Sequence, residues 1–226
     1  MSESSPRFSL LRDRILPGLA LLAMAGALWM TRPTRWNATP AEVGRTQSCL
    51  VNLAHIAHAF AHYAQDYDGK FPRGVDPEDR HHPEIWARYN AFEGQYFNDA
   101  RTAPMLHELL QPYVPHHKVW RCPEDIGWEV SRLPTLRESP LRRVKPSSWA
   151  KYGTSYYYFT IHGFAEMTAS DLNDPSRSLI LFDGDLWHRA GGQPSLNGLF
   201  ADGHTQNLTA PRFQSLLRGR SGDSEP

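Results

Sequence analysis

The side chains best suited to bind a metal ion are concentrated near the C-terminus. They are three carboxylates and two imidazoles, in the order Asp183, Asp185, His188, Asp202 and His204. Asp183 and Asp202 each follow a short run of apolar residues, so each is expected at the end of a strand. If those strands are neighbours, the loops after them converge. The sequence therefore predicts a metal site formed by these five residues.

The ligand types leave the ion open between calcium and zinc. Carboxylate oxygens alone suit calcium, which tolerates irregular loops, whereas the added imidazoles favour zinc or another transition ion. Ordinary turn chemistry is the alternative, because an Asp-Gly pair after a strand is typical of a tight turn. A bound ion would neutralise clustered carboxylates and hold two loops together, which is a structural function.

The two cysteines, Cys49 and Cys122, are too few for a disulfide scaffold or for a zinc site of four thiolates. In an exported protein they could form one disulfide. The alternative is two buried thiols, because Cys49 lies beside the apolar stripe of an expected helix.

Motifs of catalysis are missing from the sequence. There is no Gly-x-Ser-x-Gly, no His-Glu-x-x-His and no phosphate-binding glycine loop. The sequence therefore predicts a protein that is not an enzyme. The alternative is a hydrolase that uses a metal-bound water held by Asp183, Asp202 and His204.

The composition narrows the class of protein. Of 226 residues, 40% are hydrophobic, which suffices for a packed core and excludes wholesale disorder. Lys plus Arg and Asp plus Glu are both 24, so the chain lacks the positive excess of proteins that bind nucleic acid without sequence preference. We expect no nucleic-acid partner. The 18 prolines and 16 glycines argue against a helical bundle.

The strongest helical pattern runs from Pro40 to about Tyr67. Three histidines fall nearly opposite its apolar residues and are expected to face solvent. Gly69 and Pro72 end the helix. The apolar stripe, which needs a sheet or another helix to cover it, consists of Leu50, Leu53, Ile56, Ala57, Phe60, Ala64 and Tyr67, and the histidines are His55, His58 and His62.

The C-terminal third has the pattern of β-structure. We expect strands at residues 155–161, 178–183, 199–202 and 205–208, with the last two joined by the Asp202-Gly203 turn. A further strand is predicted at 119–122 and a short helix at 104–112. The expected fold is α+β, with the long helix packed on a small antiparallel sheet.

The N-terminus predicts export. Residues 15–31 are uncharged and bounded by Arg14 and Arg32, and a helix of this length spans roughly 25 Å, the short edge of what crosses a bilayer. The basic excess before it favours a cytoplasmic N-terminus. We therefore predict a cytoplasmic segment (1–14), a single transmembrane helix (15–31) in a bacterial inner membrane, a periplasmic or extracellular α+β domain (32–217) and a disordered tail (218–226). A cleaved signal peptide is the alternative to a retained anchor.

Several blocks carry a family resemblance. Residues 45–72 contain Cys49-x-x-Asn52-Leu53 followed by Tyr-x-x-Asp-Tyr-x-Gly-x-Phe-Pro, and the blocks 110–125, 154–156 and 200–204 follow in order. This pattern resembles the pseudopilin-like proteins of planctomycete-type bacteria, whose C-terminal domain is named for a His, nine residues and Asp-Gly. The resemblance implies a type IV pilin-like architecture and a membrane-anchored structural subunit of a type II secretion or type IV pilus-like assembly. Its implied partners are other pilin-like or secretion-system subunits and the membrane.

The chain departs from that family at named positions. Arg7 and Arg12 replace the Gly and Glu of the prepilin processing site, and thirteen residues separate His188 from Asp202 instead of nine. An arginine inside the membrane would add charge where the family's Glu neutralises a neighbouring amino terminus. The alternative function is an exported metal-dependent hydrolase or ligand-binding module on the same head.

Overall fold

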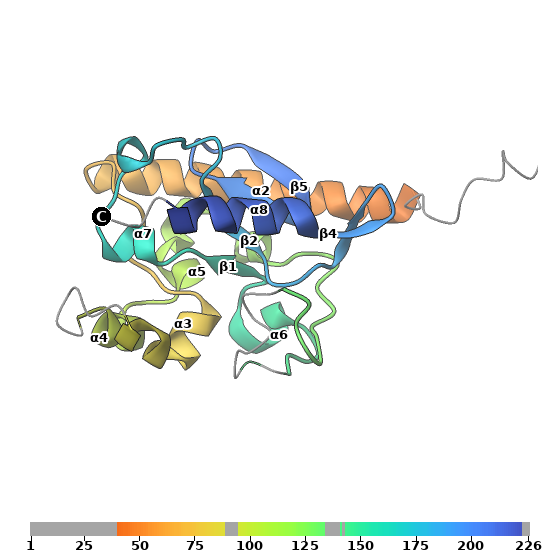
Figure 1. The fold of residues 1–226 in the computed structure, drawn as a ribbon, viewed down its shortest axis with the longest axis horizontal. Helices are drawn as coiled ribbons and strands as arrows, with labels where there is room; N and C mark the ends of the chain where they lie inside the picture. Colours follow the sequence, from red (N-terminus) through yellow and green to blue (C-terminus); the bar gives the residue numbers. More distant parts are fainter. Residues whose placement is uncertain (1–39, 89–94, 134–140, 142, 223–226) are drawn as a thin grey trace, which may run out of the picture. The chain divides into compact units, whose positions relative to one another are not determined.

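The computed structural model describes residues 40–88, 95–133, 141 and 143–222 (Figure 1). The chain divides into two units, residues 1–37 and 38–226, and the described residues belong to the second. Among them, no helix combines the length and the hydropathy that crossing a membrane requires. The predicted segments 1–14 and 15–31 lie outside the described residues.

The long N-terminal helix is confirmed as α2, Pro40–Asp66. Pro40 takes the first helical position, where its missing N–H costs nothing. The helix ends at a turn in which Asp68 and Gly69 have φ of 55° and 79°, and the left-handed region is favourable for glycine.

One face of α2 is buried at the spacing that the sequence predicts. Ala57 and Ala64 are half-buried, whereas Tyr67 is 49% exposed because it lies beyond the last helical residue. The three histidines of the opposite face are exposed, as predicted. The buried stripe consists of Cys49, Leu53, Ile56, Ala59, Phe60 and Tyr63, of which Leu53, Ile56 and Phe60 were predicted.

The sheet has five strands, all paired antiparallel: β1 Tyr156–Tyr158, β2 Leu179–Asp183, β3 His188–Ala190, β4 Gln193–Phe200 and β5 Thr205–Thr209. The order is β1-β2-β4-β3, and β5 also pairs with β4. Because β2 and β3 pair with different halves of β4, β5 lies along the opposite edge of that strand. The α+β class, the antiparallel sheet and the β4–β5 hairpin are confirmed. The hairpin between β3 and β4 was not predicted, and it lies in the segment between His188 and Asp202.

Helices cover both faces of the sheet. On β2, Asp183 contacts Cys49 of α2, whereas the ring of its neighbour Phe182 lies 5.1 Å from that of Phe213 in α8, Ala210–Gly222. Successive residues of a strand point to opposite faces, so α2 and α8 lie on opposite sides of β2. All five residues of β2 are buried for this reason, as expected for a strand between two layers.

Two predicted segments are corrected. Residues 119–122 are not a strand, because the N–H groups of Val119 and Arg121 bond to carbonyls three residues earlier and form the 3₁₀ helix η4, His117–Trp120. Residues 218–222 are not a disordered tail. They continue α8, which Phe213 and Leu216 anchor in the core, and residues 223–226 lie outside the described residues.

Short elements fill the connections between α2 and the sheet. The predicted helix at 104–112 is α5, Leu106–Leu109, followed by the 3₁₀ turn η3, Gln111–Tyr113. The remaining elements are α3 Pro77–His81, η1 Pro83–Arg88, α4 Gln95–Thr102, α6 Ser148–Tyr152, α7 Ile161–Phe164 and η6 Ala169–Asp171.

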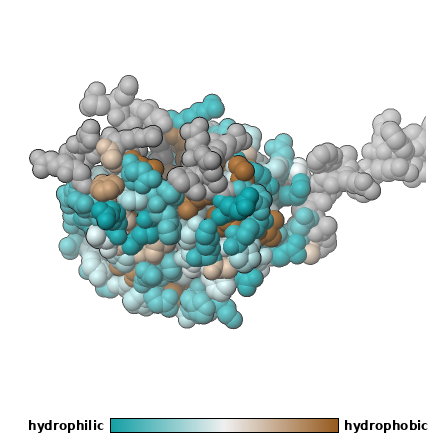
Figure 2. Space-filling model, turned by 90° about the horizontal axis from the view of Figure 1, so that it is seen from below, coloured by the Kyte–Doolittle hydropathy of each residue, from teal (hydrophilic) through white to brown (hydrophobic). Residues whose placement is uncertain are grey.

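The face drawn in Figure 2 carries small hydrophobic patches among hydrophilic residues, as is common on protein surfaces.

A second, smaller core contains two buried carboxylates. Asp76 caps α3 by accepting from the N–H of Asp79 (2.9 Å), and its other oxygen accepts from the N–H of Tyr158 in β1 (3.1 Å). Asp79 accepts from the indole N–H of Trp86 (2.8 Å). Because burial disfavours the ionised form, the pKa of Asp79 is raised to about 7.

This raised pKa predicts a pH-dependent effect of Asp79→Asn. An unfolded Asp ionises above about pH 4, whereas the folded carboxyl stays neutral until about pH 7. Rising pH therefore favours the unfolded chain across this window. Each pH unit in the window contributes about 1.4 kcal/mol, so the total is up to about 4 kcal/mol. The Asn variant, which keeps an acceptor for Trp86, should gain free energy of unfolding at pH 8 relative to wild type and little at pH 4, measured by urea denaturation.

The matched control for this prediction is Asp171→Asn. The pKa of exposed Asp171 is lowered, because its carboxylate accepts bonds from the backbone and side chain of Thr168. Its stabilising contribution is therefore present above the unfolded pKa, so this variant should lose stability at pH 8. A loss at pH 8 for Asp79→Asn as well would show that the buried carboxyl is ionised and stabilising.

Candidate metal centre

Four buried side chains with metal-binding atoms meet under α2. They are Cys49, Cys122, Asp183 and His188, with exposures of 0, 1, 0 and 3%. One ligand atom from each lies within 4.8 Å of the other three. The cluster is the one group of its kind in the part of the chain that the structure describes, and it could hold a metal ion.

Three contacts among these groups are close to the lengths expected around one small ion. The sulfur of Cys49 lies 3.2 Å from Oδ1 of Asp183, and that of Cys122 lies 3.2 Å from Nε2 of His188. Nε2 is also 3.2 Å from Oδ2 of Asp183. Around a tetrahedral zinc ion with bonds of about 2.0–2.3 Å, neighbouring ligand atoms lie about 3.3–3.8 Å apart. Small shifts would therefore suffice for all four groups to bind one ion.

Each ligand is positioned by a different segment. Cys49 lies on the buried stripe of α2, and Asp183 ends β2 on the face that α2 covers. His188 begins β3 after a tight connection from β2. Cys122 follows η4, whose Trp120 carbonyl accepts from the N–H of Ser155 (2.8 Å) next to β1. The cluster thus joins the long helix, the sheet and the loop after η4.

The charges of the cluster favour a cation. Burial disfavours a charged imidazole, but the Asp183 carboxylate and Cys49 outweigh it and raise the pKa of His188 to about 10. Burial would likewise raise the pKa of Cys49, yet its hydrogen bond with Cys122 and the nearby His188 lower it. Burial raises the pKa of Cys122. A bound cation would stabilise a thiolate and a carboxylate in this buried site.

A second layer of polar groups surrounds the ligands. The hydroxyl oxygen of Thr46 lies 3.1 Å from Nδ1 of His188. The backbone N–H of Asn197 donates to Oδ2 of Asp183 (2.6 Å), and the phenol of Tyr156 lies 3.4 Å from the sulfur of Cys49. Partners of this kind orient metal ligands and tune their affinity.

Only two of the five predicted ligands belong to the cluster, Asp183 and His188. The expectation that Asp202 and His204 converge with them is wrong, because β2 and β4 are antiparallel and their C-terminal ends lie at opposite ends of the sheet. Asp202 and His204 instead pair with each other at the exposed β4–β5 turn, with Oδ1 2.6 Å from Nδ1.

Asp185, the fifth predicted ligand, is buried, but its carboxylate bonds to other groups of the protein. Its carboxylate accepts from the backbone N–H groups of Arg132 (3.0 Å) and Leu186 (2.8 Å) and lies 3.4 Å from the Arg132 guanidinium. Asp185 therefore holds the loop after β2 in place. It is close to Asp183 in sequence but is not part of the cluster.

The two cysteines are the candidate ligands that the sequence prediction missed. Both are free and buried in the structure, and the disulfide considered for them is not formed. The available signal was their chemistry: a thiol pair in a chain with histidine and carboxylate candidates supplies the ligand types that zinc prefers. Their spacing alone gave no reason to join Cys49 to His188.

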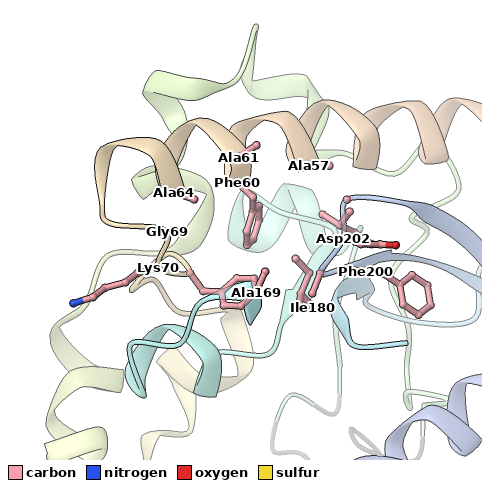
Figure 3. A pocket seen from close by; sticks show the side chains of 14 residues that line it. Ala57, Phe60, Ala61, Ala64, Gly69, Lys70, Ala169, Ile180, Phe200 and Asp202 are labelled. Carbon is pink, nitrogen blue, oxygen red and sulfur yellow. The ribbon is translucent and has the colours of Figure 1, made fainter. Parts of the chain in front are cut away.

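A cleft between α2 and the end of β4 lies apart from the cluster (Figure 3). Its lining is mainly alanine, glycine and aromatic side chains, with Lys70 and Asp202 as the charged groups. Lys70 pairs with Glu166 (2.6 Å), and Oδ1 of Asp202 lies 2.6 Å from Nδ1 of His204, so both groups already have a partner. Apart from Lys70 and Asp202, the described residues that line the cleft carry no ionisable side chain.

No protein-family model, no curated protein and no solved structure matched the chain.

Proposed function

We propose that this protein is a membrane-anchored, pilin-like structural subunit whose head is held together by one zinc ion bound to Cys49, Cys122, Asp183 and His188. Its partners are other pilin-like or secretion-system subunits, and it has no enzymatic activity. The observation that carries the structural part is the buried cluster itself, which links the long helix to the sheet. The apolar segment 15–31 and the sequence resemblance support the anchor and the class of assembly.

The ligand set favours zinc over calcium. Calcium binds six to eight oxygen atoms, mostly from carboxylates, carbonyls and water, whereas this cluster offers two sulfurs, one nitrogen and one carboxylate. Zinc is bound by Cys, His and Asp in tetrahedral sites. The two thiols are therefore the groups that decide the identity of the ion.

The closed geometry favours a structural role. A catalytic zinc keeps a coordination position for water or substrate, whereas a structural zinc takes four protein ligands. Here four ligands are available and none is more than 3% exposed. A substrate would have no access to the ion, which argues against the alternative of a metal-dependent hydrolase.

Zinc would stabilise the attachment of the long helix α2 to the head. In a pilin-like subunit the N-terminal helix would continue from the membrane into the head, so an ion between α2 and the sheet would stabilise the junction of the two. Structural zinc sites contribute about 10–16 kcal/mol of binding free energy in small peptides. A single ion bound by Cys49 and Asp183 would therefore add a direct link between α2 and β2 to the contacts that the apolar stripe makes.

The test is to recover the full-length chain from the membrane fraction of its host and to measure its intact mass and its zinc content together. We expect an unprocessed N-terminus and one zinc per chain, with Cys122→Ser reducing zinc below about one tenth. Full-length protein in the soluble cytosolic fraction would refute the anchor, and a zinc-free membrane protein would refute the metal centre.

The exposed histidines of α2 provide the control. His55, His58 and His62 lie on the solvent-facing side of the helix, where they can bind metal adventitiously. The triple variant H55Q/H58Q/H62Q should keep one zinc per chain. Zinc that is lost in this variant but retained by Cys122→Ser would place the ion on the surface and contradict the proposed site.

A further inference from the structure

The two ring nitrogens of His188 have different surroundings. Nε2 faces the cluster, 3.2 Å from the sulfur of Cys122 and 3.2 Å from Oδ2 of Asp183. Nδ1 points away from these ligands, and the hydroxyl oxygen of Thr46 lies 3.1 Å from it. The ring can therefore offer one nitrogen to an ion and the other to Thr46.

Metal binding requires one particular tautomer of this ring. The ion takes the lone pair of Nε2, so a neutral imidazole must carry its proton on Nδ1. An N–H at that position needs an acceptor, because His188 is buried and a buried donor without a partner is destabilising. The Thr46 oxygen is placed to accept that hydrogen bond.

The position of Thr46 on α2 explains how it reaches the ring. Thr46 precedes Cys49 by three residues, and side chains at this spacing lie on the same side of a helix. Its own carbonyl lies 3.5 Å from the side-chain nitrogen of Asn197, whose backbone N–H donates to Asp183. One turn of α2 therefore carries the candidate ligand Cys49, a contact to the candidate ligand His188 and a contact to Asn197, which bonds to Asp183.

We propose that Thr46 is a positioning residue of the metal centre, whose hydroxyl holds His188 in the tautomer that presents Nε2 to zinc. The inference rests on the proposed zinc site and adds to it a residue that does not touch the ion. Thr46 acts through the ring, so its removal should weaken binding without abolishing it. Loss of such a partner typically reduces metal affinity 10–100-fold.

The test compares Thr46→Val with Thr46→Ser in the full-length protein. Valine keeps the shape of the side chain and removes the hydrogen bond, whereas serine keeps the hydroxyl. Zinc affinity is measured by competition with a chelating dye, and Co²⁺ is used as a second probe whose visible spectrum reports on the ligands. We expect a 10–100-fold weaker affinity and an altered Co²⁺ spectrum for Thr46→Val, with Thr46→Ser close to wild type.

Thr102→Val is the matched control. Thr102 also lies on a helix, and its hydroxyl bonds to the carbonyl of Asn98 (2.9 Å), remote from the cluster. Its zinc affinity should equal that of wild type. The role of Thr46 is overturned if wild type binds zinc and Thr46→Val binds it equally well, or if Thr46→Ser is as weak as valine. Failure of wild type itself to bind zinc or Co²⁺ would overturn the proposed centre, and the role of Thr46 with it.

Discussion

Stripping zinc from the full-length protein should lower its melting temperature by roughly 10–20 °C. The ion would join four segments, and its loss leaves two thiols, a carboxylate and an imidazole buried at 3% exposure or less. We estimate a loss of about 5 kcal/mol, at the upper end of single-site effects and typical of a lost metal. For a domain of this size each kcal/mol corresponds to about 2–4 °C. Calorimetry before and after a strong chelator, followed by re-addition of zinc, measures the effect.

The exposed pair of Asp202 and His204 is the control for this prediction. The sequence placed both residues in the metal site, whereas the structure places them at the opposite end of the sheet. The variant D202N/H204Q should therefore keep its zinc and melt within about 3 °C of wild type, because an exposed ion pair contributes about 0–1 kcal/mol. An unchanged melting temperature after complete removal of zinc from wild type would contradict a structural role for the ion.

The elements that the sequence predicted well are those with local signals. Leu53, Ile56 and Phe60 recur at helical spacing, and all three are buried against the sheet. The strand that ends at Asp183 could be recognised from a run of branched and aromatic residues. The sequence prediction failed where tertiary contacts decide the local backbone conformation. Residues 119–122 have strand-like composition, yet their backbone closes a 3₁₀ turn below α2.

The candidate metal centre was predicted only in part, for two physical reasons. Strand direction decides which loops meet, and neighbouring antiparallel strands separate Asp183 from Asp202. Consistent use of the predicted antiparallel pairing would have excluded that convergence. The second reason is distance along the chain, because Cys49 lies 134 positions from Asp183. Packing of α2 on the sheet brings them together, and no spacing rule describes such a contact.

Replacing Asp125 by alanine should destabilise the head by about 4 kcal/mol or more. Its carboxylate accepts four hydrogen bonds, from the backbone N–H groups of Gly127 (3.0 Å), Ser148 (3.0 Å) and Trp149 (2.9 Å) and from the hydroxyl of Ser155 (2.6 Å). Hydrogen bonds to a charged group contribute about 1.5–3 kcal/mol each, and the donors left behind would be partly buried. Urea denaturation of zinc-loaded protein measures the loss.

Asp174→Ala is the control for Asp125→Ala, because Asp174 makes hydrogen bonds only within one turn. Asp174 also accepts from a backbone N–H and a serine hydroxyl, both of Ser176 (3.0 and 2.6 Å), but it is exposed and its contacts are local. Its replacement should cost about 1 kcal/mol or less. Equal losses for both variants would refute the special role of Asp125.

Asp125 also links the stability of the loop to the metal centre. It follows Cys122 by three residues, and its bonds fix the loop to the start of α6 and to the residue before β1. A ligand held by a loosened loop must be ordered when the ion binds, which reduces affinity. Asp125→Ala should therefore weaken zinc binding as well as lower stability, whereas Asp174→Ala should leave zinc affinity unchanged. Wild-type affinity in Asp125→Ala would show that the other three ligands position Cys122 without the loop.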